Sequence, residues 1–351
     1  MQKITQEVMS RIEASQGSDV VSAMQKIAMQ VLKDGVSCDE DFERLVGAFD
    51  AQRRTLELMR LLAGATAGVG QDKVDALKVA VDFTQETLDM GVSHVLQVIA
   101  ERSIASESLR LDLDSLVKVV SDSFDGNVTF GNLNYDSLLL ASLTSGFGPK
   151  LADMASGYEK TVVTINGISE TFPSLRKSGD FPSDRRILLL QLHGCICFWR
   201  DRRQGVTAKL STDIVRDPEI WDAVRSGDTN IRPMVVLSSR HDKAQQVLEQ
   251  PFNIAYEKFR ESISTSNAWI VIGYSFRDAP VNELLRSEFL KRSNKPSVLI
   301  STYGTDLARV AVEQAFGWGA EDGSSDSWLT ISRDGASGLE KSVEWEIFMG
   351  K

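Results

Sequence analysis

The spacing of apolar residues divides the chain into two parts near residue 125. Before that point, apolar side chains recur every three or four residues, as in Leu88, Val92 and Val95, which is the period of an amphipathic helix. The glycine-rich segment 64–70 interrupts this pattern at a place where a helix is expected to end. Residues 1–125 are therefore predicted to form a helical module.

Beyond residue 125, short apolar runs alternate with stretches of helical period. The runs expected to form strands are residues 128–130, 187–190, 234–237, 269–272 and 297–300. The stretches expected to form helices are residues 243–265, 280–292 and 304–316. Such alternation is typical of an α/β fold, and it predicts a Rossmann-like, doubly wound and mostly parallel sheet over residues 126–316.

The last part of the chain, residues 317–351, contains two short runs of β-like composition, 328–331 and 343–348. They lie on either side of Asp334 and Gly335, a typical turn sequence. A β-hairpin or a pair of edge strands is therefore predicted here, without a catalytic role.

Polar and glycine residues follow three of the predicted strands directly. They are the peptide Asn132-Leu133-Asn134-Tyr135-Asp136, the pair His193-Gly194, and the turn Gly273-Tyr274-Ser275. In open parallel sheets, ligands bind beyond the carboxyl ends of the strands. These three strand ends are therefore predicted to share one nucleotide-binding crevice.

Composition narrows the classes of partner. The 49 acidic and 39 basic residues give a net charge of −10, so the overall field does not favour a phosphate backbone, and direct nucleic-acid binding is not expected. Three cysteines are too few for a disulfide framework and fit a reducing compartment. No apolar run approaches the roughly 18 residues needed to cross a bilayer. A cytoplasmic protein without membrane association is predicted.

In order and spacing, the three strand-end motifs resemble those of the sirtuin-like domains of the silent information regulator family, over about residues 40–302. More narrowly, they resemble the bacterial branch that hydrolyses NAD in defence against phage. The resemblance implies NAD as substrate. It also implies a set of residues that bind it, namely Tyr135, Asp136, Gly194, Gly273, Tyr274 and Ser275. Among these, Asp136 would bind the nicotinamide amide, and Gly273 and Ser275 would border the adenosine side.

The family begins with a strand and a G-A-G-x-S-type loop that approaches the dinucleotide phosphates, and neither precedes the first predicted helix here. The segment 64–70 follows a helical pattern, so it is interpreted as a turn between helices. We therefore hypothesise that the natural reading frame starts upstream of Met1.

Cleavage of the bond between nicotinamide and ribose passes through an oxocarbenium-like state, and nicotinamide leaves as a neutral molecule. No strong general acid is therefore needed. Asn134 could hold a water against the ribose, because its amide both donates and accepts. His193 could act as the base towards that water near neutral pH. Asn134 and His193 are thus the candidate catalytic residues.

Each candidate also has a structural interpretation. Asn134 and Asp136 could cap a helix that begins near residue 137, and His193 could be held in a loop. Gly273 could allow close packing of the backbone at the end of a strand. Asp278 precedes Pro280 in a typical helix start, so a structural role is preferred for it and it is not included among the site residues.

The remaining histidines and cysteines are assigned structural roles. His94 is expected to be a histidine with satisfied hydrogen bonds, and His241 to lie in a solvated turn. Cys195 and Cys197 fit a buried strand, and no second cysteine pair exists to complete a zinc site, so no metal is expected.

Three functions follow from these observations. The first is an NAD glycohydrolase, the second is a catalytically impaired module that binds NAD or ADP-ribose or serves in assembly, and the third is an NAD-dependent protein deacylase. An enzyme that depletes NAD would harm its own cell if it were always active, so an activating partner is expected. In the resembled branch such partners include an ATPase, an Argonaute-type protein or further copies in a ring. Homo-oligomerisation is therefore also possible here.

Overall fold

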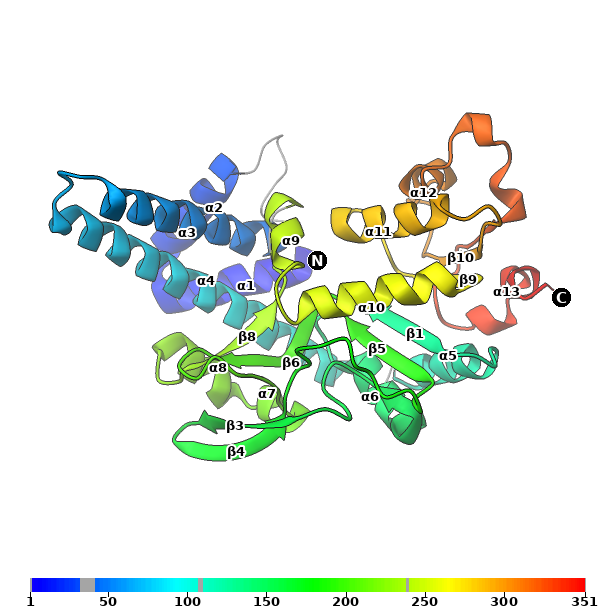
Figure 1. Cartoon of the computed structure of the whole chain (residues 1–351), viewed down its shortest axis with the longest axis horizontal. Coiled ribbons are helices and arrows are strands. Elements are labelled where there is room, and N and C mark those ends of the chain that lie inside the picture. Colours follow the sequence, from blue (N-terminus) through cyan, green and yellow to red (C-terminus); the bar gives the residue numbers. More distant parts are fainter. Residues whose placement is uncertain (1, 32–41, 107–109, 238–239, 351) are drawn as a thin grey trace.

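A computed structural model describes residues 2–31, 42–106, 110–237 and 240–350 (Figure 1). The N-terminal part consists of helices, as predicted. These are α1 (Gln2–Gln16), α2 (Ser18–Val31), α3 (Phe42–Ala65), α4 (Gln71–Ala105) and α5 (Arg110–Asp122). Helices α3 and α4 lie side by side and extend to one end of the molecule (Figure 1). Their loop, residues 66–70, confirms that the glycine-rich segment is a turn between helices.

Two three-stranded parallel sheets form the centre of the rest of the chain. In the first, β1 (Val128–Asn132) and β2 (Leu151–Ala152) lie on either side of β5 (Ile187–Gln191). In the second, β9 (Ala268–Ile272) and β11 (Leu329–Ser332) lie on either side of β10 (Ser297–Ser301). The fold is therefore α/β, but the structure divides the predicted parallel strands between two sheets.

Two antiparallel sheets complete the strand structure. One is the hairpin of β3 (Lys160–Ile165) and β4 (Ile168–Pro173). In the other, β6 (Gly194–Asp201) lies between β7 (Thr207–Lys209) and β8 (Ile231–Val235). The strand predicted at 234–237 overlaps β8, which pairs antiparallel with β6 and so lies outside the parallel sheets. Strand β6 contains Cys195 and Cys197, for which the sequence predicted a buried strand, but its antiparallel pairing with β7 and β8 was not predicted.

Helices cover the sheets and connect the strands. They are α6 (Leu138–Phe147), α7 (Thr212–Arg216), α8 (Pro218–Ser226), α9 (Arg240–Gln246), α10 (Phe252–Thr265), α11 (Ala279–Leu290), α12 (Arg309–Phe316) and α13 (Val343–Phe348). Short 3-10 helices occupy Gly148–Lys150, Ala320–Asp322, Ser325–Ser327 and Leu339–Lys341. The single helix predicted over 243–265 is in fact two, because Pro251 just before α10 cannot continue a helical hydrogen-bond ladder.

The predicted C-terminal hairpin is wrong in its second half. Strand β11 pairs parallel with β10 and forms an edge of that sheet, but residues 343–348 form α13. The Ser342 hydroxyl accepts a hydrogen bond from the Trp345 amide at 3.1 Å, which caps the first turn of this helix. Trp345 and Phe348 are buried, and their spacing of three residues places both on one face of the helix, whereas in a strand they would point to opposite faces.

In the described ranges, no helix combines the length and apolar character that crossing a membrane requires.

His94 lies on α4 with a 5 % exposed side chain, and neither ring nitrogen has a hydrogen-bond partner in the described structure. The expectation of satisfied hydrogen bonds at His94 is therefore wrong. Burial, followed by the nearby cations of Arg225 and Arg11, lowers the pKa of His94 from 6.5 to about 4. The ring is thus held neutral in the folded state.

This burial predicts a loss of stability in acid. The unfolded chain takes up a proton on His94 below pH 6.5, whereas the folded chain does so only near pH 4. The contribution of neutral His94 to the free energy of unfolding, about 3 kcal/mol, is therefore intact above pH 6.5 and is lost as pH falls towards 4. Urea unfolding at both pH values should show that His94→Leu reduces this loss. An unchanged pH dependence in the variant would contradict the assignment.

Candidate functional site

The ends of β1 and β5 are joined by side chains. Asn132 and Gln191 are paired in register, and the Asn132 amide donates to the Gln191 side-chain oxygen at 2.8 Å. The Asn132 side-chain oxygen in turn accepts from the backbone amide of Asn134 at 3.2 Å. This bond fixes the backbone where the chain leaves β1, and it leaves the Asn134 side chain exposed at the strand end.

His193 is the centre of a buried polar cluster. This residue follows β5 in the chain, and its side chain is 3 % exposed. Its Nε2 atom lies 3.3 Å from Asp278 Oδ2 and 3.3 Å from the Tyr256 hydroxyl. Asp278 follows β9, and Tyr256 comes from α10. The ends of both parallel sheets therefore meet at this histidine.

Asp278 has two roles, of which the sequence indicated only one. Its Oδ1 accepts from the Val281 amide at 3.0 Å and caps α11, which confirms the predicted helix start. Its Oδ2 reaches His193 and also lies 2.9 Å from Lys243 Nζ. Asp278 thus belongs to the candidate site, although the sequence analysis did not include it.

Lys243 links Asp278 to a second carboxylate. Its Nζ lies 3.0 Å from Glu43 Oε2, and the other Glu43 oxygen is 2.6 Å from the Tyr135 hydroxyl. The Tyr135 hydroxyl also lies 2.8 Å from the Val236 carbonyl. The polar cluster therefore runs from α3 to α11 and includes Glu43, Lys243 and Tyr256, which sequence reasoning missed because they come from distant elements.

Charge is stabilised within this cluster. Burial would raise the pKa of Asp278, but its contacts with His193 and Lys243 outweigh burial and hold the pKa of this carboxyl well below its ordinary value. Burial would lower the pKa of Lys243, but Glu43 and Asp278 reverse that effect and raise it. Asp278 is therefore an anion and Lys243 a cation at neutral pH.

Tyr135 and Asp136 have structural contacts at the end of β1. The ring of Tyr135 is buried, and its centroid lies 6.5 Å from that of the His193 ring. The backbone carbonyl of Tyr135 accepts a hydrogen bond from the Ile196 amide at 2.8 Å. Asp136 Oδ1 accepts a hydrogen bond from the Leu138 amide at 2.9 Å at the start of α6. This is the helix-capping role that the sequence left open as an alternative for Asp136. Burial raises the pKa of Asp136, so this carboxyl takes up a proton more readily than an exposed aspartate.

The two candidate glycines differ. Gly194 has φ +80°, and a Cβ there would lie 2.4 Å from the Met234 carbonyl oxygen. Gly273 has φ +64°, but a Cβ there would meet no atom within 4 Å, so close packing does not explain this glycine. The positive φ favours glycine at both positions, and at Gly194 the neighbouring strand β8 also leaves no room for a Cβ.

The turn after β9 points only partly into the site. The Tyr274 hydroxyl donates to Asn282 Oδ1 at 2.7 Å and to the Asp278 carbonyl at 3.1 Å. These hydrogen bonds stabilise the turn before α11. Ser275 is exposed. Phe276 has φ +56°, a strained conformation that is uncommon for an aromatic residue. Such strain often accompanies functional turns.

The structure therefore brings Tyr135 and Asp278 to His193. Asn134, Gly273 and Ser275 lie exposed at the strand ends. No hydrogen bond joins Asn134 to His193 in the described chain. The residues that could contact a ligand from solvent are thus separate from the buried histidine cluster.

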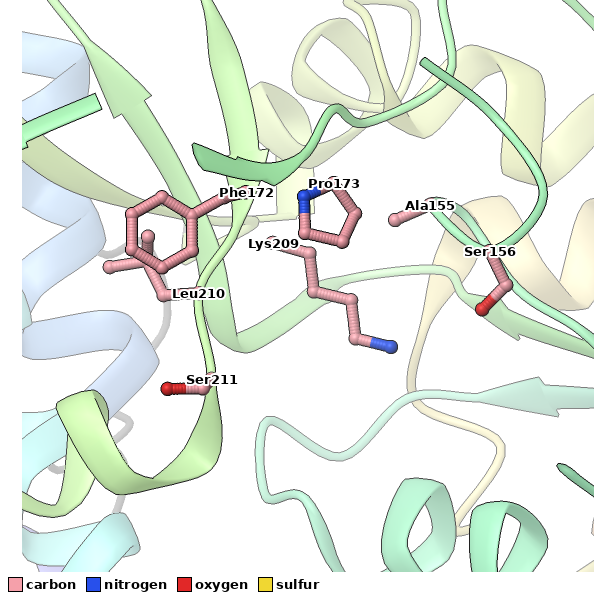
Figure 2. Close-up of a pocket in the computed structure, with 7 residues that line it drawn as sticks. All are labelled: Ala155, Ser156, Phe172, Pro173, Lys209, Leu210 and Ser211. Carbon is pink, nitrogen blue, oxygen red and sulfur yellow. The ribbon is translucent and has the colours of Figure 1, made fainter. Parts of the chain in front are cut away.

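A cavity of about 220 Å³ lies elsewhere, against the antiparallel strands β4 and β7. Figure 2 shows Lys209 there among the apolar side chains of Phe172, Pro173 and Leu210. The Lys209 ammonium is held by the carboxylate of buried Asp153, and the Lys209 side chain is 18 % exposed. None of the candidate site residues lines this cavity.

Cys195 and Cys197 lie buried in β6, as expected for a strand. Over the described residues, no group of three or more His, Cys, Asp or Glu side chains is placed to hold a metal ion.

A comparison with models of protein families finds no match to this chain. A comparison with curated proteins finds none either.

Proposed function

We propose that the chain is an NAD glycohydrolase that cleaves the bond between nicotinamide and ribose. The observation that carries this proposal is the contact of His193 with Asp278, which joins the carboxyl ends of β5 and β9 at 3.3 Å. In parallel α/β structures, this edge is where nucleotides bind. The order of the strand-end motifs, which resembles that of the sirtuin-like branch, supports NAD as the nucleotide.

In this mechanism, His193 is the base. A carboxylate at Nε2 favours the tautomer that carries its proton on Nε2, which leaves Nδ1 free to accept a proton from water. The water oxygen bonds to the ribose carbon as the bond to nicotinamide breaks, and the bonding electrons pass to the nicotinamide nitrogen. The products are nicotinamide, ADP-ribose and a proton that His193 has taken.

The exposed strand ends supply the other roles. The Asn134 amide orients the attacking water, and Asp136 binds the carboxamide of nicotinamide. Tyr135 and Gly194 hold the backbone on the nicotinamide side of NAD, and Gly273, Tyr274 and Ser275 border its adenosine side. No metal takes part in this scheme.

The proposed function also has consequences for the sheet, the cellular compartment and the partners of the protein. We expect the complete NAD site to require a single doubly wound sheet of the Rossmann type. We also expect the protein to meet NAD in the cytoplasm. An activating partner, an ATPase or an Argonaute-type protein, or further copies of the chain would restrain the activity, and defence against phage is the role that the resemblance suggests.

A second function is favoured by one observation. His193 is 3 % exposed, and both its neighbours at Nε2 are buried, so a substrate reaches the ring only after side chains move. This arrangement suits a module that binds NAD or ADP-ribose without turnover. The third function, deacylation of lysine, would show nicotinamide release only with an acylated peptide present.

Asp278→Asn tests the proposed chemistry. Asparagine still caps α11 but lacks the charge that orients His193, so turnover should fall about 100-fold or more while NAD affinity stays near wild type. Nicotinamide release and NAD binding by calorimetry measure the two effects. The matched control is Asp217→Asn, because Asp217 caps α8 through the Glu219 amide and lies outside the cluster. Equal losses in both variants would contradict the proposed role of Asp278.

A further inference from the structure

Two neighbouring cavities meet at Lys209 of β7. The first, of about 220 Å³, is the cavity of Figure 2. The second, of about 320 Å³, lies beside it, because Lys209 and Ser156 line both. Lys209 is paired in register with Phe198, in the middle of β6, whereas His193 precedes the first residue of that strand. The two cavities are therefore separate from the polar cluster around His193.

The first cavity has an apolar end. Its walls there include the side chains of Phe172, Pro173 and Leu210. Phe172 and Leu210 are buried, whereas Pro173 and Ser211 are exposed, so the cavity can be entered from solvent. An apolar cavity of roughly 150 Å³ is enough to bind benzene. This space can therefore hold one apolar group of the size of an aromatic ring.

The other end of the first cavity has hydrogen-bonding groups that are not fully used. An ammonium group has three N–H donors, and Lys209 uses its ammonium to donate to Asp153 in the described structure. The Ser156 hydroxyl has no hydrogen-bond partner among the described residues. Figure 2 shows the Lys209 ammonium and the Ser156 hydroxyl pointing towards the same space. A ligand oxygen in this space would accept hydrogen bonds from both groups.

Two cations and one anion surround this polar end. The buried carboxylate of Asp153 accepts from two backbone amides through Oδ1 and from Lys209 through Oδ2. Arg176 is also buried, and it donates to the backbone carbonyls of Asp153, Asp180 and Ser156. In the described ranges it donates to no carboxylate, and the Asp180 side chain is exposed to solvent, which screens its charge. The group formed by Asp153, Arg176 and Lys209 therefore carries an excess of one positive charge.

Lys209 is itself a cation. Burial would lower its pKa, but the Asp153 carboxylate reverses that effect and raises it. An amine that keeps its proton has no lone pair for nucleophilic attack, so the site is suited to binding an anion without covalent chemistry.

The second cavity adds another cation. It is lined by Arg185, whose NH1 group donates to two backbone carbonyls and whose Nε lies 3.6 Å from the exposed Asp184 carboxylate. The Arg185 NH2 group has no partner in the described structure. No acidic side chain lines either cavity over the described residues. Both cavities therefore favour a negatively charged ligand group.

We propose that the first cavity binds a small aromatic monocarboxylate. Its ring lies between Phe172 and Leu210, and its carboxylate accepts hydrogen bonds from the Lys209 ammonium and the Ser156 hydroxyl. A single carboxylate balances the excess positive charge, whereas a phosphate group carries more than one charge near pH 7. A neutral ligand of the same shape would leave that charge without compensation. This binding site does not depend on the proposed NAD chemistry.

Titration of the whole chain without NAD, followed by the NMR signals of each ligand, tests this proposal. The probes are benzoate, its neutral analogue benzamide, acetate, which lacks the ring, and inorganic phosphate. Benzoate should bind at one site and about tenfold or more tightly than each of the other three probes. The apolar end of the cavity favours the ring, and the ammonium favours the charge.

A double variant, Asp153→Asn with Lys209→Met, removes the ammonium without leaving an unpaired buried carboxylate. Asparagine at position 153 can still accept from the two backbone amides. The double variant should bind benzoate about tenfold or more weakly, with benzamide binding unchanged. The matched control is Lys118→Met, because Lys118 is exposed and pairs with Asp122 on α5. This control should bind benzoate as the parent chain does.

Ser156→Ala is a second test variant, because the Ser156 hydroxyl has no hydrogen bond to lose in the described structure. It should stay folded by circular dichroism and bind benzoate about threefold or more weakly. The proposal is overturned if benzoate shows no saturable binding, or if benzamide, acetate or phosphate binds as tightly as benzoate. Unchanged benzoate affinity in both variants would overturn it as well. Because NAD is absent, these outcomes are distinct from a failure of the proposed catalysis.

Discussion

Replacing His193 by glutamine is expected to lower the rate of nicotinamide release by about 10²–10⁴-fold. Glutamine can place its side-chain amide beside Asp278, but it cannot accept the proton of the attacking water. The protein should remain folded, with Lys243 still beside Asp278 at 2.9 Å. Initial rates at saturating NAD, with circular dichroism of each variant, measure the effect.

The control for this variant is His94→Leu, because His94 is the second buried histidine in the described structure and lies on α4 in the helical region. It should release nicotinamide at the wild-type rate. Activity retained by His193→Gln would remove His193 from the chemistry, and equal losses in both variants would assign the effect to the fold.

The second large effect is expected at Gly194. Gly194→Ala should lower the free energy of unfolding by about 3 kcal/mol or more, because the new Cβ would lie 2.4 Å from the Met234 carbonyl at φ +80°. Relief of that contact moves β8 away from β6 and displaces the chain beside His193. Urea unfolding monitored by tryptophan fluorescence measures the loss.

Gly273→Ala separates the two causes of this destabilisation. Its φ is +64°, but the added Cβ meets no atom within 4 Å, so only the backbone term of about 1–2 kcal/mol is expected. A loss at Gly194 no larger than at Gly273 would show that contact with β8 contributes nothing.

The sequence predicts what depends on local pattern. Strands β1, β5, β9 and β10 lie where their apolar runs predicted them, and all five residues of β5 are buried. The two-residue strand β2 was not predicted, because it is too short to form an apolar run. The cap at Asp278 was predictable because Asp before Pro is a local signal for a helix start. The turn at residues 66–70 followed from its glycines in the same way.

Contacts between distant residues were not predictable from local pattern. Asp278 looked purely structural, because its second oxygen meets His193 and Lys243 only after the chain folds. Glu43 and Lys243 are 200 positions apart, and no periodicity in the sequence links them. Residues 343–348 were misassigned because Val343, Trp345 and Ile347 alternate with glutamates as in a strand. The helix instead buries Trp345 and Phe348, and it leaves Val343 and Ile347 exposed.

The most direct test of the central claim is a measurement of nicotinamide and ADP-ribose after incubation with NAD. The chain is compared with its Asn134→Ala and His193→Ala variants. The account predicts equal amounts of the two products from the parent chain, and their loss in both variants. No nicotinamide from the folded parent chain, or undiminished release by His193→Ala, would contradict it.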